Sequence, residues 1–321
     1  MVFVRTDRLG ETVLTLPAID ALRAARPQGH LRLMVHPSVR ELFDGYPHVD
    51  EVVAEPPAAG LVGRAWSLSR LWRRWDVDVI IISNAKKEYH LAAWLAGIPV
   101  RVGYDRKWGR LLTHRIPDER PLGEQHEVEY NIALLASLGI SSALPPLLRL
   151  PVEETRARHM AQQLEGWRVQ QADRLIAIHP WTSNPRKQWP LNRFHALARE
   201  LGDQPDIRLL LIGGEAERAQ MAGWPADAGP REGRVIDAVG RLSLPELAAC
   251  LQRVRVLVTN DSGPMHVAAA VGTPVVALFG TGDPGSHPRR WGPWGSGHTV
   301  IHKPLEQITV DEVLGAVRRY L

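Results

Sequence analysis

Short apolar segments alternate with helical patterns through both halves of this chain. In the first half the alternation predicts strands at residues 2–4, 31–35, 52–53, 79–82 and 99–103. In the second half it predicts strands at residues 175–178, 209–212, 235–236, 254–258 and 274–279. Strands separated by helices form mostly parallel sheets with both faces covered by helices. We therefore expect an α/β protein with two doubly wound domains.

The length of 321 residues exceeds that of a usual single hydrophobic core, which favours two domains. The proline-rich stretch 143–151 separates the two alternating halves. We place the domain boundary there and predict domains at 1–150 and 151–321. In open parallel sheets, ligands bind outside the carboxyl ends of the strands, so a cleft between two facing domains is the expected site.

Composition is that of an ordinary globular protein, with 45% hydrophobic and 23% charged residues. The single cysteine, Cys250, excludes an internal disulfide and is expected to be a buried helix residue in a reducing compartment. Met1 leads directly into an apolar strand without a leader pattern, and no apolar stretch approaches the roughly 20 residues of a membrane span. We expect a cytoplasmic protein.

Arginines cluster in residues 64–75, although the formal net charge is only +4. One helical stripe in this segment is formed by Leu68, Leu71, Trp72 and Trp75. A basic amphipathic helix of this kind is able to lie on an anionic membrane, and it is equally able to dock its apolar stripe on its own domain. Nucleic acid is not expected as a partner, because no recognised nucleic-acid-binding signature accompanies the charge.

The clearest local motif is the apolar run at 256–260, which ends in small polar residues and opens into a helical pattern at 263–270. Asp261 or Ser262 is able to cap that helix, and Gly263 lets a ligand approach main-chain N–H groups closely. Because a helix N-terminus attracts anions, this motif predicts a phosphate site.

Polar residues also follow three other predicted strands. After the first strand, Glu11 is a candidate base for a substrate hydroxyl, or an acid that complements a helix dipole. The loop at 179–190 contains hydroxyls and Lys187, which suit a diphosphate or a polar surface loop. Glu215 is a candidate ribose contact, although its spacing alone favours a solvated helix start.

The sequence does not favour a metal site or a dinucleotide-binding site. The 13 histidines show no paired spacing with acids that would indicate a metal site. Residues 280–285 match a dinucleotide fingerprint, but the prolines and glycines after them oppose the helix that it must open.

Three segments in order, 8–17, 182–190 and 261–266, resemble family-nine glycosyltransferases, the ADP-heptose:lipopolysaccharide heptosyltransferases. The resemblance implies a GT-B fold, in which two Rossmann-like domains face each other across a cleft. The first domain would bind the acceptor and the second the nucleotide sugar. The last helix, 309–321, would pack back on the first domain. The reaction would need no metal and no cofactor besides its ADP-sugar substrate.

The resemblance also implies roles for individual residues. Glu11 takes the place of the general base, where the family usually has aspartate. Lys187 and the end of the helix that starts at Gly263 would stabilise the leaving diphosphate. The remaining donor contacts implied are Thr182 and Ser183 at the diphosphate, Glu215 at the ribose, Leu242 at the adenine, and Asp261, Ser262 and His266 at the sugar and phosphate.

The expected function is inverting transfer of a heptose from ADP-heptose to a lipid-linked acceptor in lipopolysaccharide core biosynthesis. The enzyme would act peripherally at the cytoplasmic face of the inner membrane. Candidate acceptor-binding residues are Arg64, Arg70, Lys86 and Lys87, although surface solvation explains each equally well. The alternatives are a GT-B enzyme with a hexosyl donor, a GT-B epimerase, and a nucleotide-sugar binding protein without catalysis.

Overall fold

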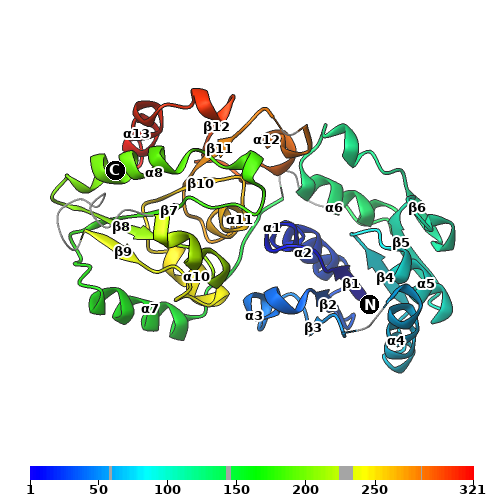
Figure 1. Ribbon diagram of the computed structural model, residues 1–321. Coiled ribbons are helices and arrows are strands. Elements are labelled where there is room, and N and C mark those ends of the chain that lie inside the picture. Colours follow the sequence, from blue (N-terminus) through cyan, green and yellow to red (C-terminus); the bar gives the residue numbers. More distant parts are fainter. Residues whose placement is uncertain (58–59, 142–145, 224–233, 283) are drawn as a thin grey trace. The chain divides into compact units, whose positions relative to one another are not determined.

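The chain divides into two compact units, Met1–Leu147 and Leu148–Leu321. A computed structural model describes residues 1–57, 60–141, 146–223, 234–282 and 284–321 (Figure 1). The division lies three residues before the boundary expected from the proline-rich stretch. Each unit is a parallel sheet with helices.

The first unit is built on a six-stranded sheet in the order β3-β2-β1-β4-β5-β6, and all of its strand pairs are parallel. The strands are β1 (Val2–Arg5), β2 (Arg32–Val35), β3 (Glu51–Ala54), β4 (Val79–Ile82), β5 (Val100–Tyr104) and β6 (His114–Ile116). The helices are α1 (Leu9–Val13), α2 (Leu16–Ala25), α3 (Arg40–Phe43), α4 (Gly60–Arg74), α5 (Lys87–Leu95) and α6 (Glu127–Ala136).

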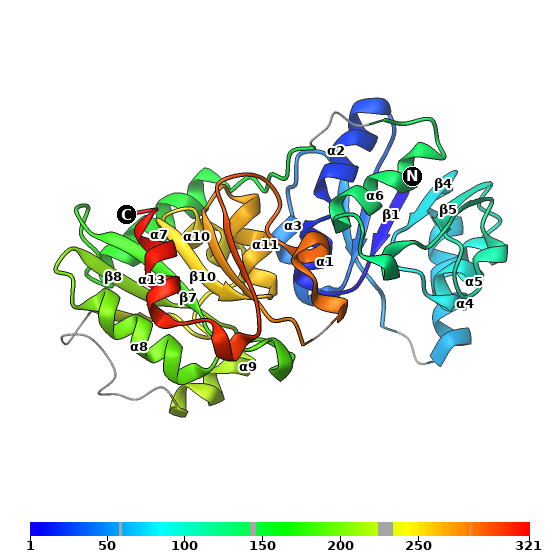
Figure 2. The ribbon, with the colours of Figure 1, turned by 90° about the horizontal axis from the view of Figure 1, so that it is seen from above.

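Helices cover both faces of this first sheet. On one face, α4 and α5 pack against each other, and Leu68 and Trp72 of α4 join a core with Val4 and Ile82 of the sheet. On the other face, α2 and α6 lie side by side (Figure 2). Burial from both faces explains why the central strands are continuous runs of valine, isoleucine and phenylalanine.

The second unit repeats the plan with a parallel sheet in the order β12-β11-β10-β7-β8-β9. Its strands are β7 (Arg174–His179), β8 (Ile207–Leu211), β9 (Val235–Asp237), β10 (Val256–Asn260), β11 (Val275–Phe279) and β12 (Thr299–His302). Its helices are α7 (Glu154–Gly166), α8 (Leu191–Gly202), α9 (Glu215–Arg218), α10 (Leu244–Leu251), α11 (Gly263–Ala270), α12 (Pro288–Trp291) and α13 (Val310–Arg318).

The ten predicted strands are confirmed, and the structure adds β6 and β12. Both additional strands lie at a sheet edge, where one side is unpaired. Their sequences contain histidine, arginine or threonine among the apolar residues. An edge strand needs less apolar surface than a central one, so the hydrophobic pattern did not indicate either of them.

The last helix, α13, belongs to the second unit. It packs against α8 and β11, and Val313 and Val317 are part of that unit's core. Its Thr309 cap accepts a hydrogen bond from the Glu312 N–H, whereas the Glu312 carboxylate pairs with Lys303 Nζ at 2.5 Å. No helix within the described residues is long and apolar enough to cross a membrane.

Candidate active site

Each sheet has a point where the order of its strands reverses. In the first unit the chain runs outward from β1 to β3 and then returns to the other side of β1 as β4. In the second unit the same reversal separates β7 from β10. Ligands of open parallel sheets bind at the carboxyl ends of the strands at such a point. The predicted motifs around Glu11, Lys187 and Asp261 follow β1, β7 and β10.

In the second unit, the structure brings Lys187 and Asp261 together. Lys187 Nζ lies 2.8 Å from Asp261 Oδ2, with the two side chains 21% and 10% exposed. The Ser286 hydroxyl is also hydrogen-bonded to this carboxylate oxygen. One cation and one anion, 74 residues apart in the chain, therefore meet at the reversal point.

Asn260 holds the Lys187 loop in place. Its side-chain oxygen accepts a hydrogen bond from the Trp189 N–H at 2.9 Å, and its Nδ2 donates to the Pro180 carbonyl at 2.8 Å. The two ends of the loop after β7 are thereby tied to the last residue of β10. Asn260 is fully buried, and sequence reasoning missed it. The sequence signal that indicates such a residue is an amide side chain at the end of an otherwise apolar strand.

The N-terminus of α11 lacks the side-chain cap that the sequence predicted. Ser262 occupies the N-cap position without a side-chain capping bond. Its hydroxyl instead lies 2.9 Å from Thr259 Oγ1 and 3.1 Å from His179 Nδ1. The first turn therefore begins at the Gly263 N–H without a capping side chain; Pro264 has no N–H, and the Met265 N–H donates to the Ser262 carbonyl at 3.2 Å. The helix dipole favours an anion at this end. His266, on the same helix, is buried.

The structure also brings the predicted ribose and adenine residues close in space. Gly240 has φ +66°, and a Cβ atom built on it would lie 2.5 Å from Glu215 Oε2. The exposed Glu215 carboxylate therefore lies over the backbone of Gly240, two residues before the half-buried Leu242. Thr182 is half-buried and Ser183 exposed, in the loop that precedes Lys187.

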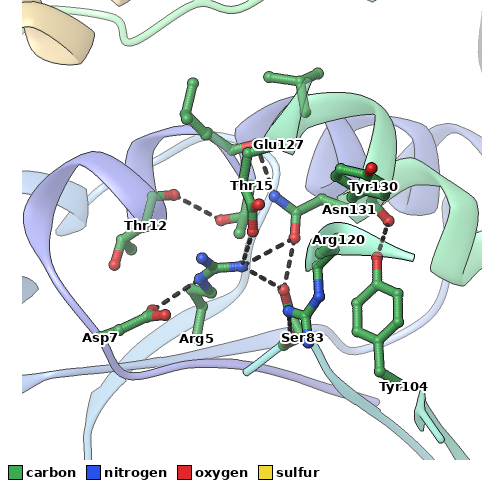
Figure 3. A network of polar contacts seen from close by, with 12 residues as sticks. Arg5, Asp7, Thr12, Thr15, Ser83, Tyr104, Arg120, Glu127, Tyr130 and Asn131 are labelled. Carbon is green, nitrogen blue, oxygen red and sulfur yellow. Dashed lines mark hydrogen bonds and ion pairs between the residues drawn. The ribbon is translucent and has the colours of Figure 1, made fainter. Parts of the chain in front are cut away.

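In the first unit, a buried arginine organises the carboxyl end of the sheet. Arg5 Nη1 donates to Ser83 Oγ at 2.7 Å, to Glu127 Oε1 at 2.9 Å and to Asn131 Oδ1 at 3.2 Å. Arg5 Nε donates to Asp7 Oδ1 at 2.7 Å. Figure 3 shows this guanidinium among partners from the segment after β1, from the residue after β4 and from α6. The network fixes the backbone from which α1 begins.

Glu11 lies half-buried in the first turn of α1. Burial, and then the negative charge of Asp7, raise the pKa of Glu11, and hydrogen bonding to its own N–H and the charges of Arg5 and Arg8 offset this only in part. A carboxylate with a raised pKa is a stronger base once ionised. Its position is compatible with both interpretations of the sequence, a base and a helix-start acid.

Arg64 and Lys86 join a second polar cluster at this edge. Lys86 Nζ lies 3.1 Å from Thr6 Oγ1 and 3.0 Å from Tyr89 OH. The hydroxyl of Tyr89 donates to Glu55 Oε1 at 2.7 Å, and Arg64 Nη1 donates to the same oxygen at 2.6 Å. The buried Glu55 and Tyr89 were not found from the sequence, because each stands alone among unrelated residues.

The other two acceptor candidates lie outside this cluster. Lys87 is exposed, with Nζ 5.9 Å from the centre of the Trp108 ring. Arg70 is exposed on the outer side of α4. Of the four basic candidates, the structure therefore unites Arg64 and Lys86.

Neither a metal site nor a reactive thiol is found among the described residues. The described residues contain no group of three or more histidine, cysteine, aspartate or glutamate side chains able to hold a metal ion. Cys250 is buried in α10, as expected, and burial raises its pKa to about 12. A thiol with this pKa is protonated at neutral pH and is a poor nucleophile.

The geometry at both strand-order reversals agrees with a family match. The model of glycosyltransferase family 9 (heptosyltransferase) matches residues 66–313. The chain belongs to glycosyltransferase family 9. It is 28% identical over 295 residues to lipopolysaccharide heptosyltransferase 2 of Escherichia coli K12, covering 86% of this chain and 81% of that protein. The protein is therefore a glycosyltransferase of the lipopolysaccharide heptosyltransferase family.

Solved structures show the same fold. A family 9 glycosyltransferase from Veillonella parvula superposes with a TM-score of 0.86 at 22% identity, covering 99% of this chain and 96% of that one. The E. coli ADP-heptose lipopolysaccharide heptosyltransferase II gives 0.82 at 23% identity, covering 99% and 97%. The expected GT-B fold with two Rossmann-like units is confirmed.

Proposed function

We propose that this protein is an inverting glycosyltransferase that moves a heptose from ADP-heptose to a lipid-linked acceptor of the lipopolysaccharide core. The observation that carries the proposal is the Lys187–Asp261 pair beside the uncapped N-terminus of α11. A cation and a helix N-terminus are what a nucleoside diphosphate requires. The relative solved from E. coli is named for ADP-heptose, which supports the same donor here.

In this proposal the second unit binds the donor. Lys187 and the first turn of α11 stabilise the charge that develops on the diphosphate as ADP leaves, a role that a divalent metal fills in other enzymes. Thr182 and Ser183 add hydroxyl donors to the diphosphate. Glu215 accepts a hydrogen bond from the ribose, and Leu242 packs against the adenine. Asp261, Ser262 and His266 then remain for the sugar.

The chemical step is a single displacement. Glu11 takes the proton of the acceptor hydroxyl, and the oxygen attacks the anomeric carbon from the side opposite the diphosphate. The bond from that carbon to the ADP oxygen breaks, so the configuration inverts and ADP leaves with the bonding electrons. The longer side chain of glutamate places this base one methylene further from the backbone than the family's usual aspartate.

The first unit binds the acceptor. Arg64 and Lys86 belong to one cluster at the end of its sheet, and the exposed Lys87 adds a further cation nearby in the chain. Cations at that edge suit an acidic acceptor such as a phosphorylated lipid-linked sugar. We infer that the enzyme meets this acceptor as a peripheral protein at the cytoplasmic face of the inner membrane.

Transfer from ADP-heptose to a phosphorylated lipid-linked acceptor, in the presence of a chelator, tests the proposal. Wild type should turn over, and NMR should show the inverted anomeric configuration in the product. Glu11→Gln should lose about 10²–10⁴ in kcat, the usual contribution of a general base, while ADP affinity stays unchanged. Glu154→Gln, an exposed first-turn acid of α7, is the matched control.

Two results would reject parts of this scheme. Turnover that survives in Glu11→Gln would show that the carboxylate is only a helix-start acid. Preferential binding of UDP, or transfer of a hexose in place of a heptose, would identify a different donor on the same fold.

A further inference from the structure

One side of α4 is used within its own unit. Ala65, Leu68 and Trp72 are buried against the sheet and α5, with Leu71 and Trp75 packed at the margin of the same core. This is the stripe for which the sequence left two interpretations open. Its burial shows that it docks on its own unit, so this stripe is not a membrane-binding face.

Beside the buried stripe, α4 carries other large apolar side chains that are exposed. Val62 is 73% exposed and Trp66 is 55% exposed. These positions are four residues apart, so they lie on the same side of the helix, one turn from each other. On α5, which packs beside α4, Trp94 is 52% exposed (Figure 1). Three large side chains thus face solvent on two adjacent helices.

Basic residues accompany these side chains. Arg70, Arg73 and Arg74 are all exposed, and α4 contains no acidic residue. The Arg73 guanidinium donates to the Leu95 carbonyl, which ties the C-terminal turn of α4 to the residue next to Trp94. The nearest acids that follow in the chain are Asp76 and Asp78, beyond the end of the helix.

We propose that this surface, formed by Val62, Trp66, Arg70 and Arg74 of α4 with Trp94 of α5, rests on an anionic lipid bilayer. Tryptophan is favoured at a membrane interface because its ring is apolar and its N–H is polar. Each arginine near an anionic surface contributes about a fivefold gain in partitioning. The inference rests on the proposed function, since a lipid-linked acceptor brings the enzyme to such a surface.

The same chemistry argues against a second copy of the chain as the occupant. A symmetric pair formed through this surface would place the arginines of one copy against those of the other. A stable interface also buries about 800 Å² per partner with a continuous apolar centre. Here the exposed apolar side chains are interspersed with arginines, whereas an anionic bilayer complements both kinds of side chain.

Co-sedimentation with vesicles tests the proposal. Wild type should bind vesicles of equal parts phosphatidylcholine and phosphatidylglycerol, and high salt should release it from them. It should not bind vesicles of pure phosphatidylcholine. Trp66→Ala/Trp94→Ala should lower the partition coefficient at least tenfold, and Arg74→Glu at least fivefold. Leu122→Ala, at an exposed apolar residue outside the surface, and Arg318→Gln, at an exposed arginine of α13, are matched controls.

The proposal would be overturned if wild type bound both vesicle types alike or did not bind anionic vesicles. It would also be overturned if the variants bound like wild type. Sedimentation velocity that shows a wild-type dimer lost in Trp66→Ala/Trp94→Ala would overturn it too. ADP calorimetry separates this inference from the proposed function. If the surface is wrong, ADP binding and transfer to a lipid-free acceptor remain in all variants. If the function is wrong, vesicle binding remains while ADP binding is absent from wild type.

Discussion

Replacing Lys187 by alanine tests the role assigned to the second unit most directly. The substitution removes the cation proposed for the diphosphate and leaves Asp261 with Ser286 as its remaining hydrogen-bond partner among the contacts described above. Two effects should therefore appear together, a loss of ADP affinity and a loss of stability.

The size of each effect follows from the geometry. Unit charges 2.8 Å apart attract each other by about 6 kcal/mol at an effective dielectric constant of about 20, before the desolvation of both groups is subtracted. Leaving the mostly buried Asp261 without its cation should cost about 1–3 kcal/mol of unfolding free energy. Losing a charged hydrogen bond to the diphosphate, worth about 1.5–3 kcal/mol, should weaken ADP binding about 10- to 150-fold.

Isothermal titration calorimetry with ADP and urea unfolding measure the two quantities. Lys303→Ala is the control, because Lys303 also forms an ion pair with an acid of the same unit, at 2.5 Å from Glu312. Asp261→Asn should bind ADP at least as tightly as wild type, since it removes an anion that competes for Lys187. The reasoning is refuted if Lys187→Ala binds ADP like wild type, or if Asp261→Asn loses as much affinity as Lys187→Ala.

Three further predictions concern the pKa of Glu11, the backbone at Gly240 and the ionisation of His179. Because a base acts when ionised, kcat/KM should rise with pH through the raised pKa of Glu11, and Asp7→Asn should move that rise to lower pH; a pH–rate profile unchanged in the variant would contradict the coupling. Gly240→Ala should destabilise the second unit by about 1–2 kcal/mol because Gly240 has a φ of +66°, and it should weaken ADP binding by displacing Glu215. The double variant Gly240→Ala/Glu215→Ala should show the same loss of stability in urea unfolding. Full stability of the single variant would show the backbone argument to be wrong. Burial lowers the pKa of His179 to about 4, below the unfolded value near 6.5, so protonating the ring costs the native state about 3 kcal/mol more than the unfolded state. This stability is present above pH 6.5 and is lost as the pH falls from 6.5 toward 4. His179→Gln should lose less stability than wild type between pH 7 and pH 4.5, and an equal loss would exclude His179 as the titrating group.

The strands of this protein were readable from the sequence because most are buried on both faces. Runs such as Val79–Ile82 can be recognised as strands without knowing which strands pair with them. The edge strands β6 and β12 carry polar residues and depend on a neighbouring strand that the sequence does not identify.

The candidate site was predictable in its residues and less so in its contacts. Lys187 and Asp261 were each recognised as strand-end residues, and the strand order that makes them neighbours came only from the structure. The predicted Ser262 cap is wrong because His179 and Thr259 offer its hydroxyl other partners. Such competition between a local and a distant partner cannot be evaluated from local spacing.

The Arg5 network has a consequence for how the first unit is made during translation. Arg5 belongs to the first strand, yet its partners Ser83, Glu127 and Asn131 lie 78, 122 and 126 residues later. Until α6 has left the ribosome, a native-like sheet would bury this guanidinium without Glu127, at a cost of several kcal/mol. The first unit is therefore expected to remain unfolded on the ribosome until nearly all of its sequence has emerged, and then to fold as a whole.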